Sequence, residues 1–475
     1  MENPPYNSGG PPPGGINPNT VLLITSIASF STPFTLSSVN VALPAISRDL
    51  NMSALELGWV SLSFLLASSV LLVPLGRAAD IYGRKKIFAS GFIIFTAASL
   101  FCALSQKPWQ LISFRVLQGF GSSMIFGTGI AILTTVFPAS KRGRALGVVS
   151  ASVYLGLTLG PFLGGILVQG LSWRSIFYLN VPVGLLVLYL IYAKLKTEWK
   201  GSENESFDLK GSIIYSLSLA ALMYGLSTVP RASSWALMAA GFGGCAWFLK
   251  HELSAPYPVL NARLFLKNKA FIFANLAALL NYCACFALSF LLSLYLQYVK
   301  GFSPSQAGFI MVFQPVFMVL FSPAAGRLSD RIEPRLVSSW GMALTAAGLL
   351  FFSRINALTP ISVIIAGLCV LGTGLALFSA PNTNAVMGSV EQRSYSLASA
   401  LLATMRVTGQ LLSMAIVMLL FSLFIGKSRI GPENLDQLAI SFRIAVYIFT
   451  AMSVLGVFTS LQRGNVIKPV VRSIQ

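Results

Sequence analysis

Acidic side chains are scarce in this sequence, which has 14 Asp and Glu residues against 33 Lys and Arg residues in a total of 475. It contains a single histidine, His251, and no acid lies in the middle of an apolar stretch. The sequence has no nucleophile–base pair, and it lacks the glycine-rich loop with a Walker lysine that would bind a nucleotide phosphate. These absences argue against an enzyme and an ATP-driven pump, and we expect no cofactor.

Cysteine is also rare. All five cysteines fall inside apolar stretches, where they form neither a disulfide framework nor a four-ligand metal site. Cys283 and Cys285 are only two residues apart, and neighbours two apart on a helix point to different faces. We therefore expect no metal and expect all five to be small core residues: Cys102, Cys245, Cys283, Cys285 and Cys369.

Charged residues of both signs make up only 10% of the chain, whereas soluble domains carry roughly 25%. Hydrophobic residues make up 55%, and the mean hydropathy is +0.75. Apolar stretches of about 20 residues, the length of a helix that crosses a bilayer, recur from Thr20 almost to the C-terminus. The sequence therefore predicts an all-α membrane protein with fourteen transmembrane helices. The predicted spans are 20–46, 58–79, 87–105, 109–137, 142–170, 175–194, 211–229, 234–250, 270–299, 307–326, 335–353, 358–387, 396–425 and 440–462.

The formal net charge of +19 would suggest nucleic-acid binding in a soluble protein. Here most of the basic residues fall in alternate short loops, the pattern that keeps one face of a membrane protein in the cytoplasm. We therefore expect a multi-pass protein of the cell membrane with both termini cytoplasmic and no nucleic-acid partner. Residues 1–19, rich in Pro and Gly and without a basic n-region, are expected to be a disordered cytoplasmic tail rather than a signal peptide. Residues 466–475 are expected to form a second cytoplasmic tail.

A repeat is visible in two loops. Gly76-Arg-Ala-Ala-Asp80-Ile-Tyr-Gly83-Arg84-Lys85 returns in weakened form as Gly326-Arg-Leu-Ser-Asp330-Arg331-Ile-Glu-Pro-Arg335. The offset, 326 − 76 = 250 residues, is about two spans more than six helices and their loops require. We therefore expect two six-helix bundles, at 20–200 and 261–465, with two inserted peripheral helices at 201–260.

The motifs in these loops and spans resemble those of the major facilitator superfamily, and within it the fourteen-span drug:proton antiporter family of the multidrug efflux type. Residues 76–86 resemble the superfamily's loop motif, and Arg115-Val-Leu-Gln-Gly119-Phe-Gly121 resembles its fourth-span motif. The run 156–165 resembles the fifth-span antiporter motif. Residues 172–182 and 39–44 resemble the fourteen-span branch. The resemblance implies the major facilitator fold, with transport by alternating access between the two bundles.

The loop motif is a candidate gate. Asp80 lies one helical turn before Arg84, and the run from Gly83 to Lys86 forms a tight basic turn that could grip a neighbouring helix end and release it. The alternative is a topological anchor with no switching role, which would account for the basic residues and not for Asp80. The candidate gating residues are Gly76, Asp80, Gly83, Arg84, Lys85, Gly326, Asp330 and Arg331.

The fifth span presents a face without side chains, because Gly156, Gly160 and Gly164 are spaced four residues apart. Pro161 removes one backbone donor beside this face, and Gly165 extends it. A partner helix can approach closely there, so packing of the small-xxx-small kind is part of its role. The family resemblance implies, in addition, that this face lies at the interface between the two halves.

Two arginines lie at a depth where a lone guanidinium costs roughly 2.5 kcal/mol or more. Arg115 is followed by Gln118, and Arg406 is followed by Gln410. Each arginine therefore either faces a water-filled pathway or bonds to carbonyls and holds helices together. The candidate pathway residues are the polar groups within otherwise apolar spans: Asn40, Arg115, Gln118, Tyr154, Asn275, Asn281, Gln314, Asn382, Asn384, Arg406 and Gln410.

The sequence departs from the family at Thr35, which occupies the first-span position where proton-coupled members carry an acid. A proton antiporter needs a group that binds a proton in one state and releases it in the other. With no acid opposing the two arginines, the pathway should be neutral or electropositive and should favour anionic or zwitterionic amphiphiles over cationic drugs.

These observations predict a secondary transporter that moves a small amphiphilic organic compound, as an exporter and as a monomer in contact with membrane lipid. Two alternatives stay open. One is a uniporter, or an anion or lipid carrier, of the same fold without proton coupling. The other is a membrane sensor or scaffold that no longer transports, although a static scaffold would need neither the loop motif nor the glycine face.

Overall fold

The computed structural model describes residues 17–200, 206–229, 231–256, 268–390, 395–426 and 428–464; for 139–144, 227, 330, 395–397 and 400 it describes the backbone alone. Every regular element in these residues is a helix. Fourteen helical segments among them are long and apolar enough to cross a membrane, which confirms the predicted number of spans. Most of the expected tail 1–19 and all of the tail 466–475 lie outside the described residues, and residues 18 and 19 already belong to the first helix.

The first bundle contains six helices. They are α1 (Pro18–Leu50), α2 (Ala54–Tyr82), α3 (Arg84–Leu104), α4 (Pro108–Val136), α5 (Ala139–Gly170) and α6 (Arg174–Lys194). Proline at the first helical position starts α1 and α4, where its missing N–H has no partner to lose. A capping box starts α2, because Ser53 and Glu56 satisfy each other's backbone N–H groups.

The second bundle follows the same plan with one broken span. Its helices are α10 (Lys269–Leu294), continued by the π-helical turn η1 (Tyr295–Val299), then α11 (Pro304–Met311), α12 (Phe313–Arg331), α13 (Pro334–Phe352), α14 (Ile361–Gly388), α15 (Tyr395–Phe424), the short 3-10 helix η3 (Pro432–Asn434) and α16 (Leu435–Leu461). The break between α11 and α12 has a local cause, because Pro315 cannot donate to the carbonyl of Met311 one turn earlier. These two helices form one membrane span.

The helix pairings of the first bundle recur in the second. In the first, α1 packs on α5, α2 on α4, and α3 on both α4 and α6. In the second, α10 packs on α15, α12 on α14, and α13 on both α14 and α16. The two bundles meet along two seams, one between α2 and α15 and the other between α5 and the broken span α11–α12. The repeat seen in the loops therefore extends to the packing of the helices.

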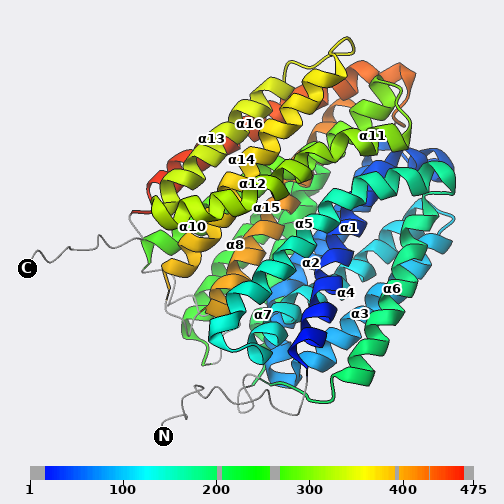
Figure 1. Ribbon diagram of the computed structural model, residues 1–475. Helices are drawn as coiled ribbons and strands as arrows, with labels where there is room; N and C mark the ends of the chain where they lie inside the picture. The colour runs from blue at the N-terminus through cyan, green and yellow to red at the C-terminus, as the bar shows by residue number, and fades with distance from the viewer. Residues whose placement is uncertain are drawn as a thin grey trace, which may run out of the picture.

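The two inserted helices are α7 (Leu209–Thr228) and α8 (Ala232–Ser254) (Figure 1). Helix α7 covers one seam, because it packs on both α2 and α15, and the hydroxyl of Ser216 donates to the carbonyl of Val70 on α2. Helix α8 packs mainly on α7, and its exposed aromatic side chains include Trp235, Phe242 and Trp247. The second seam has no such cover within the described residues.

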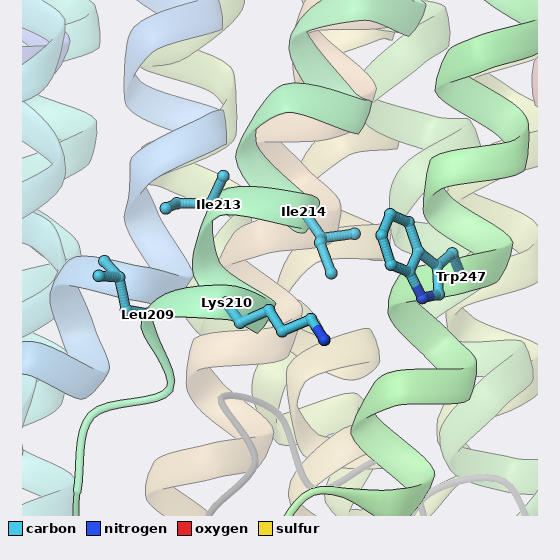
Figure 2. A pocket seen from close by; sticks show the side chains of 5 residues that line it. All are labelled: Leu209, Lys210, Ile213, Ile214 and Trp247. Atoms are coloured by element: carbon cyan, nitrogen blue, oxygen red, sulfur yellow. The ribbon is translucent and has the colours of Figure 1, made fainter.

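A groove of about 400 Å³ lies between α7 and α8. Figure 2 shows Ile214 on α7 and Trp247 on α8 facing each other across this groove, with the side chain of Lys210 below them. Leu209 and Ile213 complete its lining. All five residues belong to the inserted pair, so this groove is separate from the interface between the bundles.

Helix α1 begins and α16 ends at the same end of the molecule, called here the terminal end (Figure 1). The other end, where α1 ends and α2 begins, is called the opposite end. These two names give the direction of each helix without assigning a side of the membrane.

Candidate transport pathway

A polar cluster joins the two bundles near the middle of their helices. The hydroxyl of Tyr154 on α5 lies 3.2 Å from the hydroxyl of Ser379 on α14, and the hydroxyl of Tyr282 on α10 lies 3.5 Å from the same atom. Arg406 on α15 donates from its Nη2 to the hydroxyl of Thr383 at 2.9 Å. These five residues, the central cluster, come from four helices, of which only α5 belongs to the first bundle.

Arg406 is the only cation among the members of the central cluster. Its guanidinium carbon lies 5.6 Å from the centre of the Tyr282 ring, and its Nε is buried without a hydrogen-bond partner. A guanidinium has five N–H donors, and a buried donor without an acceptor costs about 1–3 kcal/mol. In this arrangement Arg406 can donate hydrogen bonds to an anionic or strongly polar group of a ligand that lies against the aromatic rings.

A second mid-helix contact between the bundles lies on the seam between α2 and α15. The hydroxyl of Ser69 on α2 lies 3.4 Å from the hydroxyl of Thr408 on α15. Close approach of α15 to α10 is possible beside it because Gly409 has no side chain, and a Cβ there would lie 2.5 Å from the carbonyl oxygen of Leu279. Polar contacts therefore link the bundles at mid-helix, from α5 to α14 and from α2 to α15.

Three predicted pathway asparagines of the second bundle are buried with unpaired polar atoms. Asn281 has neither its Oδ1 nor its Nδ2 hydrogen-bonded, and Asn382 has an unpaired Oδ1. Asn275 donates to the carbonyl of Phe271 and keeps an unpaired Oδ1. Buried amides are normally hydrogen-bonded, so these atoms mark α10 and α14 as helices where a polar ligand or water could bind.

The remaining predicted pathway residues of the second bundle differ from one another. Asn384 bonds to the hydroxyl of Ser329 and so joins α14 to α12. Gln314 lies at the start of α12, where its carbonyl oxygen would be 2.2 Å from a Cβ at Gly372. Gln410 is half-buried on α15, one turn after Arg406. The structure therefore joins Arg406 and Tyr154 in one cluster and places Asn384 in a contact between helices.

Arg115 lies inside the first bundle. It is fully buried, donates from its Nε to the carbonyl of Val60 on α2 at 3.0 Å, and stacks 4.3 Å from the centre of the Phe64 ring. Its Nη1 donates to Gln118, whose amide in turn donates to the hydroxyl of Ser99 on α3. These contacts join α2, α3 and α4, and they are the ones expected if Arg115 holds helices together.

Asn40 also bridges helices. Its Oδ1 accepts from Ser61 on α2, and its carbonyl accepts from Ser293 on α10 at 2.7 Å. One residue further along α1, the carbonyl of Val41 accepts from the amide of Gln297. Asn40 therefore lies where the first helices of the two bundles cross.

Thr35 is fully buried between α1 and α6. Its hydroxyl lies 2.8 Å from the carbonyl of Ser31 and 3.0 Å from the Oδ1 of Asn180 on α6, whose Nδ2 donates to the carbonyl of Ile176. The position at which the resemblance implies an acid is therefore occupied by a neutral pair, Thr35 and Asn180. Neither side chain changes charge in the physiological pH range.

The bundles are held together at the opposite end. The guanidinium of Arg429 donates to the side chain of Asn51, and the backbone N–H of Ala54 donates to the carbonyl of Ser428. On the other seam, a Cβ at Gly165 would lie 2.5 Å from the carbonyl oxygen of Pro304, so α5 and α11 touch backbone to backbone. The described contacts thus close the opposite end on both seams.

The glycine face of α5 is divided between two partners. A Cβ at Gly156 would lie 2.5 Å from the carbonyl oxygen of Phe30, and Gly160 and Gly164 similarly face Ser37 and Ser38, all on α1. The resemblance implies an interface between the halves, but these three glycines pack within the first bundle. Two neighbouring residues of the motif reach the second bundle: Gly165 contacts α11 at Pro304, and the carbonyl of Pro161 lies against Gly308. The reason is that α5 lies between α1 and α11, so adjacent residues on its surface face different bundles.

The loop motif forms a connected group at the terminal end. The Nε of Arg84 lies 2.8 Å from the Oδ1 of Asp80, and its Nη1 donates to the hydroxyl of Thr135 and the carbonyl of Ala131 on α4. Gly83 has a φ of 123°, a conformation that favours glycine, and it separates α2 from α3. Arg84 therefore joins α2, α3 and α4.

The other residues predicted to act in gating have fewer contacts. Helix α2 crosses α4 closely at Gly76, because a Cβ at Gly127 on α4 would lie 3.3 Å from the Cα of Gly76. A Cβ at Gly326, the equivalent position in the second copy, would meet nothing within 4 Å. Arg331 is exposed, and the side chain of Asp330 lies outside the described atoms. Lys85 contributes its backbone N–H to a contact described below. The second copy of the motif therefore lacks the close glycine crossing of the first.

Tyr282, Ser379 and Thr383 complete the central cluster but do not stand out in the sequence. Hydroxyl groups in membrane helices commonly bond to a carbonyl one turn earlier, as Thr383 does to Ser379, so their sequence pattern does not distinguish a site. Only their position near Tyr154 of the first bundle distinguishes them from other hydroxyl-bearing residues. A helpful sign would have been the four-residue spacing of Ser379 and Thr383 in a span that also contains Asn382.

Comparisons with known proteins agree with this architecture. The family model of the Major Facilitator Superfamily matches residues 25–273 and 274–468. The multidrug resistance protein Stp of Mycobacterium tuberculosis is 30% identical over 406 residues, which cover 83% of this chain and 74% of Stp. The riboflavin transporter RibZ of Clostridioides difficile is 29% identical over 411 residues, which cover 86% of this chain and 88% of RibZ.

Solved structures show the same fold at low sequence identity. A POT family transporter in complex with a thioalcohol-conjugated peptide superposes with a TM-score of 0.71 at 13% identity, over 94% of this chain and 96% of that one. The matched family model covers nearly the whole chain, and the helix pairings repeat between two bundles. The protein is thus a multi-pass membrane protein that belongs to the Major Facilitator Superfamily, and it is a secondary transporter.

Proposed function

We propose that this transporter exports a small amphiphilic organic compound across the cell membrane by alternating access between its two bundles. The observation that carries the proposal is the central cluster, where Tyr154 of one bundle meets Ser379 of the other beside Arg406. A polar group that both bundles share at mid-depth is where a substrate can be held while either end opens. The names of Stp and RibZ, a multidrug resistance protein and a riboflavin transporter, support a small organic substrate.

In this proposal the substrate competes with the contacts of the central cluster. A ligand with an aromatic body and an anionic or polar group would lie against Tyr154 and Tyr282 and would accept hydrogen bonds from Arg406. Charge-assisted hydrogen bonds of this kind contribute about 1.5–3 kcal/mol each. Binding would replace the contact between Tyr154 and Ser379, and this would loosen one link between the bundles.

Opening the opposite end requires the contacts of Asn51 with Arg429 and of Gly165 with Pro304 to separate. We propose that the loop motif around Asp80 and Arg84, whose described contacts lie within the first bundle, fixes the end of α2 and so sets how α2 meets α15 of the second bundle at the terminal end. Two states whose free energies differ by only a few kcal/mol can then exchange when substrate binds. The proposed orientation puts the terminal end in the cytoplasm, as the distribution of basic residues suggests.

Transport without a membrane carboxylate is part of the proposal. The pair formed by Thr35 and Asn180 supports it, because neither group can carry a proton across at physiological pH. The second candidate function therefore keeps the same fold and site and is a uniporter, or an anion or lipid carrier, driven by its substrate gradient. In both cases the substrate leaves chemically unchanged, and the protein works as a monomer surrounded by lipid.

Three aromatic dyes of different charge separate these candidates. Purified protein in proteoliposomes would be tested with fluorescein (anionic), riboflavin (neutral) and ethidium (cationic), each with and without an imposed pH gradient and membrane potential. We expect movement of fluorescein or riboflavin down the substrate gradient. Tyr154→Phe should change its rate, whereas Tyr192→Phe, on the exposed surface of α6, should not. Movement of none of the dyes or their analogues would favour a sensor or scaffold.

A further inference from the structure

Helix α3 begins without a capping side chain of its own. Its N-cap residue is Gly83, so the first N–H groups of the helix need acceptors from elsewhere. The acceptors for the first three N–H groups come from two residues of the segment that follows α6. The N–H of Arg84 donates to the carbonyl of Trp199 at 2.8 Å, and those of Lys85 and Lys86 donate to the two carboxylate oxygens of Glu198 at 2.8 and 3.2 Å.

The glycine is necessary for this contact. A Cβ at Gly83 would lie 2.7 Å from the carboxyl carbon of Glu198, and the φ of 123° is unfavourable for other residues. Glu198 is also well placed electrostatically, because a negative charge at a helix N-terminus interacts favourably with the helix dipole. The glycine of the loop motif therefore leaves space for a carboxylate from a distant part of the chain.

The segment that carries Glu198 is anchored beside the loop motif. Leu195 and Trp199 are 1% and 6% exposed, so apolar side chains on both sides of Glu198 fix its position. After the undescribed residues 201–205, the ring of Phe207 contacts that of Tyr82 with centroids 6.2 Å apart. The connection from the first bundle to α7 thus touches the loop motif before and after that gap, and α7 then packs on both bundles.

We propose that Glu198 is a positioning residue for the gate, which caps α3 from outside and so holds Arg84 in its contacts with Asp80 and Thr135. Arg84 is the first residue of α3, and its side chain bonds to both α2 and α4. Movement of the connection to α7 would move the cap and, through it, the gate. This inference rests on the proposed function, because it assumes that the loop motif acts in gating.

The test compares two acids that both cap helices. Glu198 caps α3 across a long sequence separation, and Glu56 caps α2 within its own capping box at the opposite end. The single variants are Glu198→Ala, Glu198→Gln, Glu56→Ala, Glu56→Gln and Asp80→Asn, and the double variant combines Glu198→Ala with Asp80→Asn. Amide hydrogen exchange is measured across residues 84–87. Initial rates are measured in proteoliposomes with whichever of fluorescein and riboflavin the parent protein carries faster.

We expect Glu198→Ala to raise amide exchange at Lys85 and Lys86 by roughly tenfold, the effect of losing a helix cap. Glu198→Ala should also lower the maximal transport rate several-fold with little change in KM. Glu198→Gln keeps one acceptor oxygen, so its maximal rate should lie between those of the parent protein and Glu198→Ala. The Glu56 variants should leave the maximal rate unchanged. Combined with Asp80→Asn, Glu198→Ala should add no further loss, because both act through the same group.

Unchanged exchange in Glu198→Ala would overturn the cap itself. If Glu198→Ala raises amide exchange but transports at the same rate as the Glu56 variants, the cap is only structural, and this also overturns the inference. The proposed gate can fail separately: if Asp80→Asn and Glu198→Ala both transport at the parent rate while exchange rises, the loop motif does not gate. If Asp80→Asn slows transport and Glu198→Ala does not, only the positioning role of Glu198 fails.

Discussion

The hydroxyl of Tyr154 lies 3.2 Å from that of Ser379, and this contact joins a helix of the first bundle to a helix of the second. Tyr154 comes from α5, which packs on α1 inside its own bundle and on the broken span α11–α12 outside it. A rocking motion between the bundles changes the distance between these two hydroxyls, whereas it leaves contacts within a bundle intact. We therefore propose that the cluster around them responds to both the substrate and the conformation.

Replacing the arginine of the central cluster should change substrate choice. Arg406→Gln should raise the KM for fluorescein by roughly tenfold, since a lost charge-assisted hydrogen bond of 1.5–3 kcal/mol corresponds to tenfold or more. Riboflavin should be affected much less. The measurement is the concentration dependence of initial uptake rates in proteoliposomes, and an equal change for both dyes would contradict a role in charge selection.

Arg115→Gln provides the matched comparison because Arg115 joins α2, α3 and α4 within one bundle. The substitution should lower stability by roughly 1–3 kcal/mol through buried hydrogen bonds left unmade. Thermal unfolding in detergent should therefore begin at a lower temperature, while the ratio of KM values for the two dyes should stay the same. A selective loss of fluorescein transport would return Arg115 to the pathway.

Asp80→Asn should leave the protein folded and inserted but slow transport severely. The side chain keeps its size and loses the charge that pairs with Arg84 at 2.8 Å. Expression and thermal unfolding serve as controls for folding, and the initial transport rate is the quantity of interest. Transport at the parent rate would show that the loop motif is a topological anchor.

A pH gradient by itself should move little substrate. Thr35 bonds to Asn180 at the position where the family resemblance implies an acid, and the described acids do not lie at mid-span. Proteoliposomes with an imposed pH gradient and no substrate gradient should therefore show almost no net fluorescein or riboflavin movement. Strong export of ethidium driven by the pH gradient, unchanged in Arg406→Gln, would contradict this prediction and indicate an unrecognised coupling group.

The glycine face of α5 should tolerate no side chain at its centre. A Cβ at Gly160 would clash with the side chain of Ser37 and lie 2.9 Å from the backbone carbonyl oxygen of Phe34, so Gly160→Ala should destabilise the first bundle by about 1–3 kcal/mol. Gly147 lies on the same helix with nothing within 4 Å of its Cβ position, and Gly147→Ala is the control. Thermal unfolding of both variants checks this, and equal unfolding temperatures would contradict the close packing of α5 on α1.

The sequence alone determined the membrane class, the number of spans and the twofold repeat. Long apolar stretches leave few choices, because in lipid the backbone must satisfy its own hydrogen bonds and a helix does so locally. The repeat around Asp80 and Asp330 indicated two bundles in the same way, since it depends only on the order of residues along the chain.

The tertiary structure decided which polar residues face the interface between the bundles. Arg115 and Arg406 have similar neighbours in sequence, each with a glutamine one turn later, yet one lies inside a bundle and the other beside Tyr282. The difference comes from how each helix is rotated against its neighbours, and in lipid an apolar span gives little indication of that rotation because its outer face is as apolar as its core. The capping of α3 by Glu198 likewise joins residues more than a hundred positions apart, and only packing of the whole chain brings them together.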